Sequence, residues 1–111
     1  MIHTCHAHGC KIVVPARMFV CRRHWAVLRQ IVKDAVWREY RDGQEDRKDP
    51  TPRYMAVQRR AVAELAFKPN DEQAAQIAAA YLFESEKWRR VAIEMGQGDP
   101  IMGLEEGSAM Q

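Results

Sequence analysis

The sequence lacks a long apolar run, a large net charge and a cysteine framework. Its longest unbroken apolar stretch, residues 77–83, is far too short to cross a bilayer, and the N-terminus has no apolar stretch of signal-peptide length. Lys and Arg number 17 against 15 Asp and Glu, a formal charge of +2 that argues against an obligate polyanion binder and a disordered chain. Three cysteines, an odd number, argue against a disulfide framework. We therefore expect a cytoplasmic protein without a membrane partner.

The length of 111 residues and the apolar content of 47% suit one domain with one modest core. The apolar residues of 25–96 recur with helical spacing, whereas 97–111 contain glycine and proline without a period. We predict a single domain in which a small N-terminal module, 1–24, continues into a helical bundle, 25–96. A flexible tail, 97–111, is expected to follow.

The strongest signal is the grouping of the residue types that bind metals. All three cysteines and all four histidines precede residue 25, with the spacing Cys5-x4-Cys10-x10-Cys21-x2-His24. Structural zinc sites are usually tetrahedral with sulfur and nitrogen ligands, and three cysteines with one histidine are a common set. The sequence therefore predicts one structural zinc ion held by these four residues.

The ligand set has one alternative, because Cys5-x2-His8 also resembles a metal-binding turn. In that alternative His8 replaces Cys10. We favour Cys10 because a thiolate is the better structural zinc ligand. His3 and His6 are candidates for groups that support the ligands from outside.

The two ligand pairs are expected on different local structures. Gly9 allows the backbone to bend between the first two cysteines. Residues 12–14 and 18–20 are short apolar runs around Pro15-Ala16, so we expect them to pair as a hairpin. Cys21 and His24 then fall at the start of the first helix. A hairpin between the pairs and a helix after the last ligand indicate a treble-clef-like zinc module.

Three helices are predicted from apolar residues at spacings of three and four. The first covers about 22–40, and the second covers about 52–68 with Thr51 as its cap. The third and longest runs from its cap, Asn70, to Gly96. The fold class is therefore mainly α, a small treble-clef-like zinc module with a short β-hairpin followed by a three-helix bundle.

The N-terminal pattern resembles that of a family of small zinc-binding phage and prophage proteins. The segments that carry the resemblance are Cys5-His6-Ala7-His8-Gly9-Cys10, Val14-Pro15-Ala16-Arg17-Met18 and Cys21-Arg22-Arg23-His24-Trp25. It continues to about residue 67, through Val36-Trp37-Arg38-Glu39-Tyr40-Arg41, Gly43-Gln44-Glu45 and Pro52-x-Tyr54. The resemblance implies that Cys5, Cys10, Cys21 and His24 bind zinc and that the position of His8 varies. It also implies a phage or prophage origin, hence the host-cell cytoplasm, but no particular activity.

The charge is distributed unevenly along the chain. Residues 1–70 carry an excess of seven positive charges, the rest an excess of five negative ones, and no acid precedes Asp34. The basic residues beside the predicted metal site are Lys11, Arg17, Arg22 and Arg23. They are candidates for phosphate contacts in a nucleic-acid-binding module. The alternative is a solvated face without a ligand.

Two further features are candidate interaction surfaces. Trp37 departs from the apolar stripe of the first helix, so we expect it to be partly exposed. Beside Tyr40 it is a candidate anchor for a protein partner, because Trp, Tyr and Arg dominate binding hot spots. The alanine-rich stretch of the third helix, residues 74–80, allows close packing in the core or between two copies in a homodimer.

We do not expect an enzyme. The sequence has no glycine-rich phosphate loop and no Ser-His-Asp set, and its histidines and cysteines are committed to the metal. The first hypothesis is a small accessory protein of phage or prophage type that binds, and in one version inhibits, a host or phage protein. The alternative is a zinc-finger-like nucleic-acid-binding protein that uses the basic N-terminal module.

Overall fold

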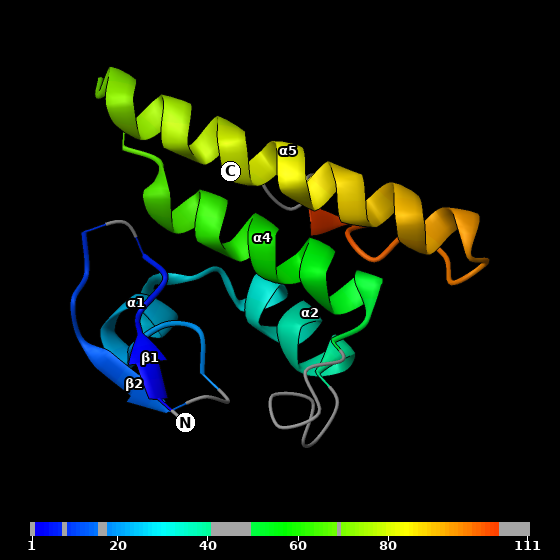
Figure 1. Cartoon of the computed structure of the whole chain (residues 1–111), viewed down its shortest axis with the longest axis horizontal. Helices are drawn as coiled ribbons and strands as arrows, with labels where there is room; N and C mark the ends of the chain where they lie inside the picture. Colours follow the sequence, from blue (N-terminus) through cyan, green and yellow to red (C-terminus); the bar gives the residue numbers. More distant parts are fainter. Residues whose placement is uncertain (1, 8, 16–17, 41–49, 69, 105–111) are drawn as a thin grey trace.

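A computed structural model of the chain describes residues 2–7, 9–15, 18–40, 50–68 and 70–104 (Figure 1). Strands β1 (Ile2–Thr4) and β2 (Val13–Pro15) precede the described helices, α1 (Arg22–Val27), α2 (Gln30–Glu39), α4 (Pro52–Ala66) and α5 (Glu72–Glu94). The predicted fold class, mainly helical with one short hairpin, is confirmed. None of the helices in the described ranges is long and apolar enough to cross a membrane.

The antiparallel hairpin joins segments other than those predicted. His3 of β1 lies opposite Val14 of β2, and the N–H of Cys5 extends the ladder by donating to the carbonyl of Ile12 at 2.8 Å. The predicted pairing of residues 12–14 with 18–20 is therefore wrong. The hairpin encloses the loop between Cys5 and Ile12 and does not lie between the two ligand pairs.

Backbone hydrogen bonds explain this arrangement. The N–H of Met18 closes a turn onto the carbonyl of Pro15 at 2.9 Å. The N–H of His6 then donates to the carbonyl of Phe19 at 2.7 Å, so residues 18–20 run beside the loop after β1. Phe19 and Val20 are buried there instead of facing solvent from a strand.

The first predicted helix is broken into α1 and α2. Leu28 and Arg29 have extended backbones, with ψ of 146° and 144°, although neither residue is a helix breaker by type. Tertiary contacts account for the break, because Leu28 is buried and Arg29 donates to Glu64 of α4 and to the carbonyl of Leu104, each at 3.0 Å. The predicted apolar stripe nevertheless holds across the break, since Val32, like Leu28, is buried.

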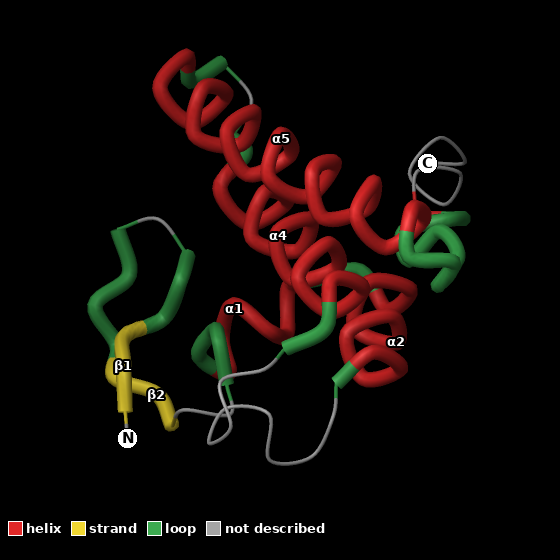
Figure 2. Tube along the Cα trace, turned by 45° about the vertical axis from the view of Figure 1, so that its right-hand side comes forward, coloured by secondary structure: helices red, strands yellow, loops and turns green. Residues whose placement is uncertain are grey.

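Helix α4 is the centre of the bundle. It packs along α5 on one side and against α2 on the other (Figure 1). Val57 and Val62 have no exposed surface, and the hydroxyl of Ser85 in α5 donates to the carbonyl of Ala56 at 2.7 Å. Figure 2 shows the hairpin beside α1, at the side of the molecule away from α5.

Helices α4 and α5 begin at residues whose side chains cap them, whereas α1 and α2 have no side-chain cap. The hydroxyl of Thr51 accepts from the N–H of Tyr54 at 3.1 Å and Pro52 occupies the first turn, as predicted. The predicted cap Asn70 is wrong by one residue. Asp71 caps α5, accepting from the N–H of Ala74 at 3.0 Å, while Asn70 adopts φ 65° in the preceding turn.

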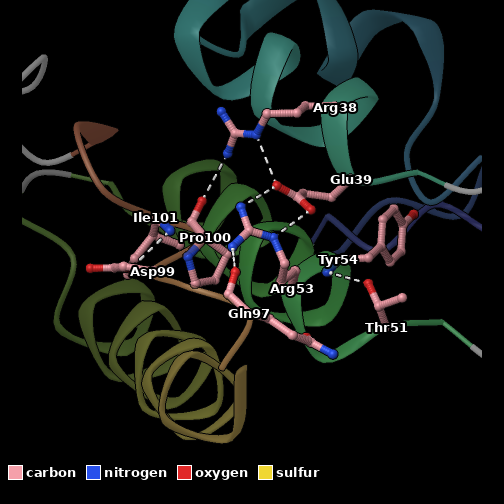
Figure 3. Close-up of polar contacts among 9 residues, drawn as sticks. All are labelled: Arg38, Glu39, Thr51, Arg53, Tyr54, Gln97, Asp99, Pro100 and Ile101. Carbon is pink, nitrogen blue, oxygen red and sulfur yellow. Dashed lines mark hydrogen bonds and ion pairs between the residues drawn. The ribbon is translucent and has the colours of Figure 1, made fainter. Parts of the chain in front are cut away.

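The prediction of an unpacked tail from residue 97 does not hold for residues 97–104. Gly96 ends α5 with φ 75°, and the chain turns back so that Ile101 and Leu104 are buried. Arg38 of α2 donates to the carbonyl of Pro100 at 3.0 Å (Figure 3). Backbone carbonyls of this segment thus serve as hydrogen-bond acceptors for arginines of the bundle. Residues 105–111 lie outside the described residues.

Figure 3 shows the polar network that joins α2, α4 and the segment after α5. Arg53 donates through Nε and Nη2 to the two carboxylate oxygens of Glu39, each at 2.8 Å, and through Nη1 to the carbonyl of Gln97. Arg38 donates to the same carboxylate at 2.8 Å. Paired donors on a carboxylate that is only 9% exposed fix the angle between the two helices.

Candidate metal centre

The four predicted ligands come together at one point. The sulfur atoms of Cys5, Cys10 and Cys21 and a ring nitrogen of His24 all lie within 4.8 Å of one another. Nδ1 of His24 is 3.4 Å from Sγ of Cys5 and 3.2 Å from Sγ of Cys21. A tetrahedral zinc with bonds of about 2.0–2.3 Å would separate its ligand atoms by about 3.5–3.8 Å. The cluster therefore has the size and the donor set to hold a metal ion.

Local structure explains why these residues converge. Cys5 follows β1 directly, and a turn closed by the N–H of Cys10 on the carbonyl of Ala7, at 3.0 Å, brings the second sulfur back. Gly9 has φ 81°, a left-handed conformation that glycine adopts without strain, so the backbone bends between the first two cysteines. Cys21 is the N-cap of α1 and His24 lies one turn into that helix, which places both on the same side.

The electrostatic surroundings differ among the sulfurs. The backbone N–H of His24, at the positive end of α1, lowers the pKa of Cys21 to about 6. Burial raises the pKa of Cys5, although the N–H of Cys21 donates to its sulfur at 3.3 Å. Metal ions bind the thiolate form of cysteine, which the start of α1 favours at Cys21 and burial disfavours at Cys5.

His3 and His6 do not belong to the cluster of candidate ligands, and each contacts a backbone carbonyl of the segment before Cys21. Nε2 of His3 lies 2.6 Å from the carbonyl of Met18, and Nδ1 of His6 lies 2.8 Å from the carbonyl of Phe19. The two imidazoles, on either side of Cys5 in the sequence, thus join the chain around Cys5 to the segment that leads to Cys21. Neither of these contacts is to a candidate ligand, so the role of supporting the ligands stays a prediction. The alternative ligand, His8, lies outside the described residues.

A cavity of about 530 Å³ opens between the metal-ligand segment and the helices. Its lining comes from Met18, Phe19, Val20, Arg22, Trp25, Val36, Trp37, Tyr40 and Tyr54. The predicted partner-binding residues Trp37 and Tyr40 therefore lie in one wall, and Trp37 is 66% exposed. The sequence does not indicate that Phe19 and Tyr54 line a common cavity. Its pattern assigns Phe19 to a predicted strand and Tyr54 to the apolar face of a predicted helix.

The aromatic rings of this cavity form a continuous series. Phe19 contacts Trp25 edge to face with ring centroids 6.3 Å apart, and Trp25 contacts Trp37 at 6.1 Å. Trp37 then meets Tyr40 at 5.9 Å, and Tyr40 meets Tyr54 at 6.2 Å. Edge-to-face pairs at these distances are favourable. The series connects α1, which carries His24, through α2 to α4.

The arginines divide into two groups. Every arginine described from the start of α2 to the end of α5 lies within 4.0 Å of a carboxylate oxygen; these are Arg29, Arg38, Arg53, Arg59, Arg60, Arg89 and Arg90. Arg22, Arg23 and Lys11 are exposed, and no carboxylate among the described residues pairs with them. No acid precedes Asp34 in the sequence, so an acidic partner for these residues could come only from a distant part of the chain, as Glu64 does for Arg29. Arg17, the fourth basic candidate, lies outside the described residues.

Comparisons of this chain with known protein families, with curated proteins and with solved structures give no match. The resemblance to small phage proteins therefore stays a prediction from the sequence.

Proposed function

We propose that this chain is a small non-enzymatic accessory protein of phage or prophage type, which uses a structural zinc ion to hold a surface for a protein partner. The observation that carries the proposal is the cavity beside the metal cluster, whose wall presents Trp37 to solvent. Exposed tryptophan beside tyrosine and arginine is the usual composition of a binding hot spot. The partner would be a host or phage protein in the host cytoplasm, and inhibition of that protein is one form the interaction would take.

Zinc is the metal we propose for the cluster. Three thiolates and one imidazole at near-tetrahedral spacing suit zinc better than magnesium or calcium, which prefer oxygen ligands. Two ligands on a turn and two at the start of a helix support a treble-clef-like module, although the hairpin encloses the first ligand pair and does not lie between the two pairs. Four protein ligands leave no open position for a water molecule, so the ion supports the structure and performs no chemistry.

The experiment is affinity capture from bacterial lysate with zinc-loaded protein as bait. The wild-type chain and the matched variants Trp37→Ala and Phe83→Ala are compared, because Phe83 is also exposed but lies on α5, away from the cavity. We expect a partner that Phe83→Ala retains and Trp37→Ala loses. Capture of no protein by a folded wild-type bait would contradict the proposal.

A zinc-finger-like nucleic-acid-binding protein is the second candidate. It is supported by the positive charge of Lys11, Arg22 and Arg23, which are exposed and have no carboxylate partner in the described part of the chain. Phosphate contacts would make its affinity for generic DNA or RNA fall steeply with salt, and replacing Arg22 and Arg23 by alanine would weaken it. Absence of binding at about 50 mM salt would exclude this candidate, since phosphate contacts are strongest there.

A further inference from the structure

The charge and the donor groups of the aromatic cavity restrict what can occupy it. Among the lining side chains that the structure describes, Arg22 is the only charged one, and the indoles of Trp25 and Trp37 can only donate hydrogen bonds. None of these described lining residues has a carboxylate or a side-chain amide that could accept a hydrogen bond from a ligand. An occupant that brings hydrogen-bond acceptors or negative charge is therefore matched to Arg22 and to the indole donors of this lining.

The shape favours one inserted group over a row of stacked bases. The rings of the series meet at interplanar angles of 61° to 84°, so their faces do not lie parallel along a track. Non-specific single-strand binders instead use successive aromatic faces beneath successive bases. A cavity of about 530 Å³ falls in the range of sites that take up a compact apolar group.

We propose that the cavity binds an acidic segment of a protein, with a large apolar side chain inserted among the rings and a neighbouring carboxylate on Arg22. Arg22 is available for this contact because, unlike the arginines of α2, α4 and α5, it has no carboxylate partner among the residues that the structure describes. The charge excess of the acid-free N-terminal module attracts the same segment from a distance. This inference rests on the proposed function and names the chemistry of the partner.

The test uses the full zinc-loaded chain and three blocked pentapeptides that differ in charge: Gly-Asp-Phe-Asp-Gly, Gly-Asn-Phe-Asn-Gly and Gly-Lys-Phe-Lys-Gly. Binding is followed by NMR on the three tryptophan indole N–H signals. Trp25 and Trp37 line the cavity, whereas Trp88 on α5 is an internal control. We expect shifts of the two cavity signals, with the acidic peptide binding about tenfold more tightly than the neutral one and the basic peptide weakest.

Two variants distinguish the contribution of the Arg22 charge to peptide affinity from the contribution of the aromatic lining. Arg22→Gln should bring the acidic peptide to the affinity of the neutral one, while Trp37→Ala should weaken all three about tenfold. Arg90→Gln on α5 removes an exposed charge far from the cavity and should change nothing. A preference for the acidic peptide that survives Arg22→Gln, a basic peptide that binds best, or shifts confined to Trp88 would overturn the inference.

An octamer of thymidine nucleotides provides the other class of ligand. If it shifts the signal of Trp37 at lower concentration than any peptide, the protein occupant is rejected in favour of single-stranded nucleic acid. Failure of this inference differs from failure of the proposed function. If Trp37→Ala still binds a captured partner, the protein binds a partner but not through the cavity, and only the inference fails. If the peptides bind the cavity but no partner is captured, the proposed function fails and the inference about the chemistry of the cavity does not.

Discussion

The indole of Trp25 meets the indole of Trp37 edge to face, with ring centroids 6.1 Å apart. Trp25 follows the ligand His24 in α1, and Trp37 lies in α2 across the break at Leu28 and Arg29. The position of the metal-ligand segment therefore sets the position of one cavity wall. The cluster of candidate metal ligands and the candidate binding surface are thus connected by the contact between these two rings.

We first predict that removing the metal disturbs the tryptophan pair. Near-ultraviolet circular dichroism of the protein should change when a chelator is added, because the two indoles lose their fixed angle. Trp37→Phe should abolish most of that change, whereas Trp88→Phe, which alters a tryptophan of α5 outside the cavity lining, should leave the change as it is in the wild type. A chelator-induced change that is the same in both variants would show that the pair does not report the metal.

The second prediction concerns the ligand Cys21. Cys21→Ser should lower the zinc content from about one ion per chain towards zero, because structural sites need four good ligands. Since metal binding supplies folding energy, residues 2–28 should become sensitive to proteolysis while the far-ultraviolet signal of α4 and α5 largely persists. Metal analysis and limited proteolysis measure both effects.

Ala26→Ser is the matched control for this variant, since it introduces the same hydroxyl at an exposed position of the same helix. It should keep the metal and the protease resistance of the wild type. Equal protease resistance of Cys21→Ser and Ala26→Ser would argue against a structural role for the metal.

The third prediction is a pH dependence centred on Glu39. Hydrogen bonds from Arg53, with a smaller contribution from Arg38, hold the pKa of Glu39 below its ordinary value. A carboxylate with a depressed folded-state pKa contributes stability above its unfolded pKa, about 4.3, and loses it as the pH falls through the folded value. Glu39→Gln should therefore reduce the free energy of unfolding by about 1–3 kcal/mol at pH 7. The difference should shrink below about pH 4.

Denaturant titrations of wild type and Glu39→Gln at pH 7 and at lower pH measure this difference. Glu94→Gln is the control, because Glu94 is exposed and forms no ion pair with the residues described by the structure. It should change the free energy of unfolding by less than about 0.5 kcal/mol at either pH. A difference for Glu39→Gln that stays constant as the pH falls would refute the ion pair with Arg53.

The fourth prediction tests the packing of residues 97–104. Leu104 is 2% exposed and its carbonyl accepts from Arg29, so Leu104→Ala should reduce the free energy of unfolding by about 2–5 kcal/mol. Met102, two residues earlier, is 74% exposed, and Met102→Ala should have little effect. Thermal or denaturant unfolding compares the two. If both variants are as stable as the wild type, this segment does not pack on the bundle.

The set of candidate metal ligands and most of the helices could be predicted from the sequence because they depend on residues that are close together in the chain. Donor types and their spacing identify Cys5, Cys10, Cys21 and His24, and hydrogen bonds within a few residues place the cap at Thr51. The single error among the caps has the same local origin. Asn70 and Asp71 are both good caps, and only the backbone shows that Asn70 takes the left-handed turn while Asp71 accepts the hydrogen bond.

Tertiary contacts determine the features of the fold that the local sequence does not determine. Arg29 lies in a sequence that is compatible with one continuous helix, but its bonds to Glu64 and to the carbonyl of Leu104 favour the break between α1 and α2. The same carbonyl shows why residues 97–104 pack, although glycine and proline in that stretch predict a tail. The partner of each strand, the burial of this segment and the aromatic cavity all depend on residues far apart in the chain. The spacing and periodicity of residues along the sequence do not indicate which distant residues will be in contact.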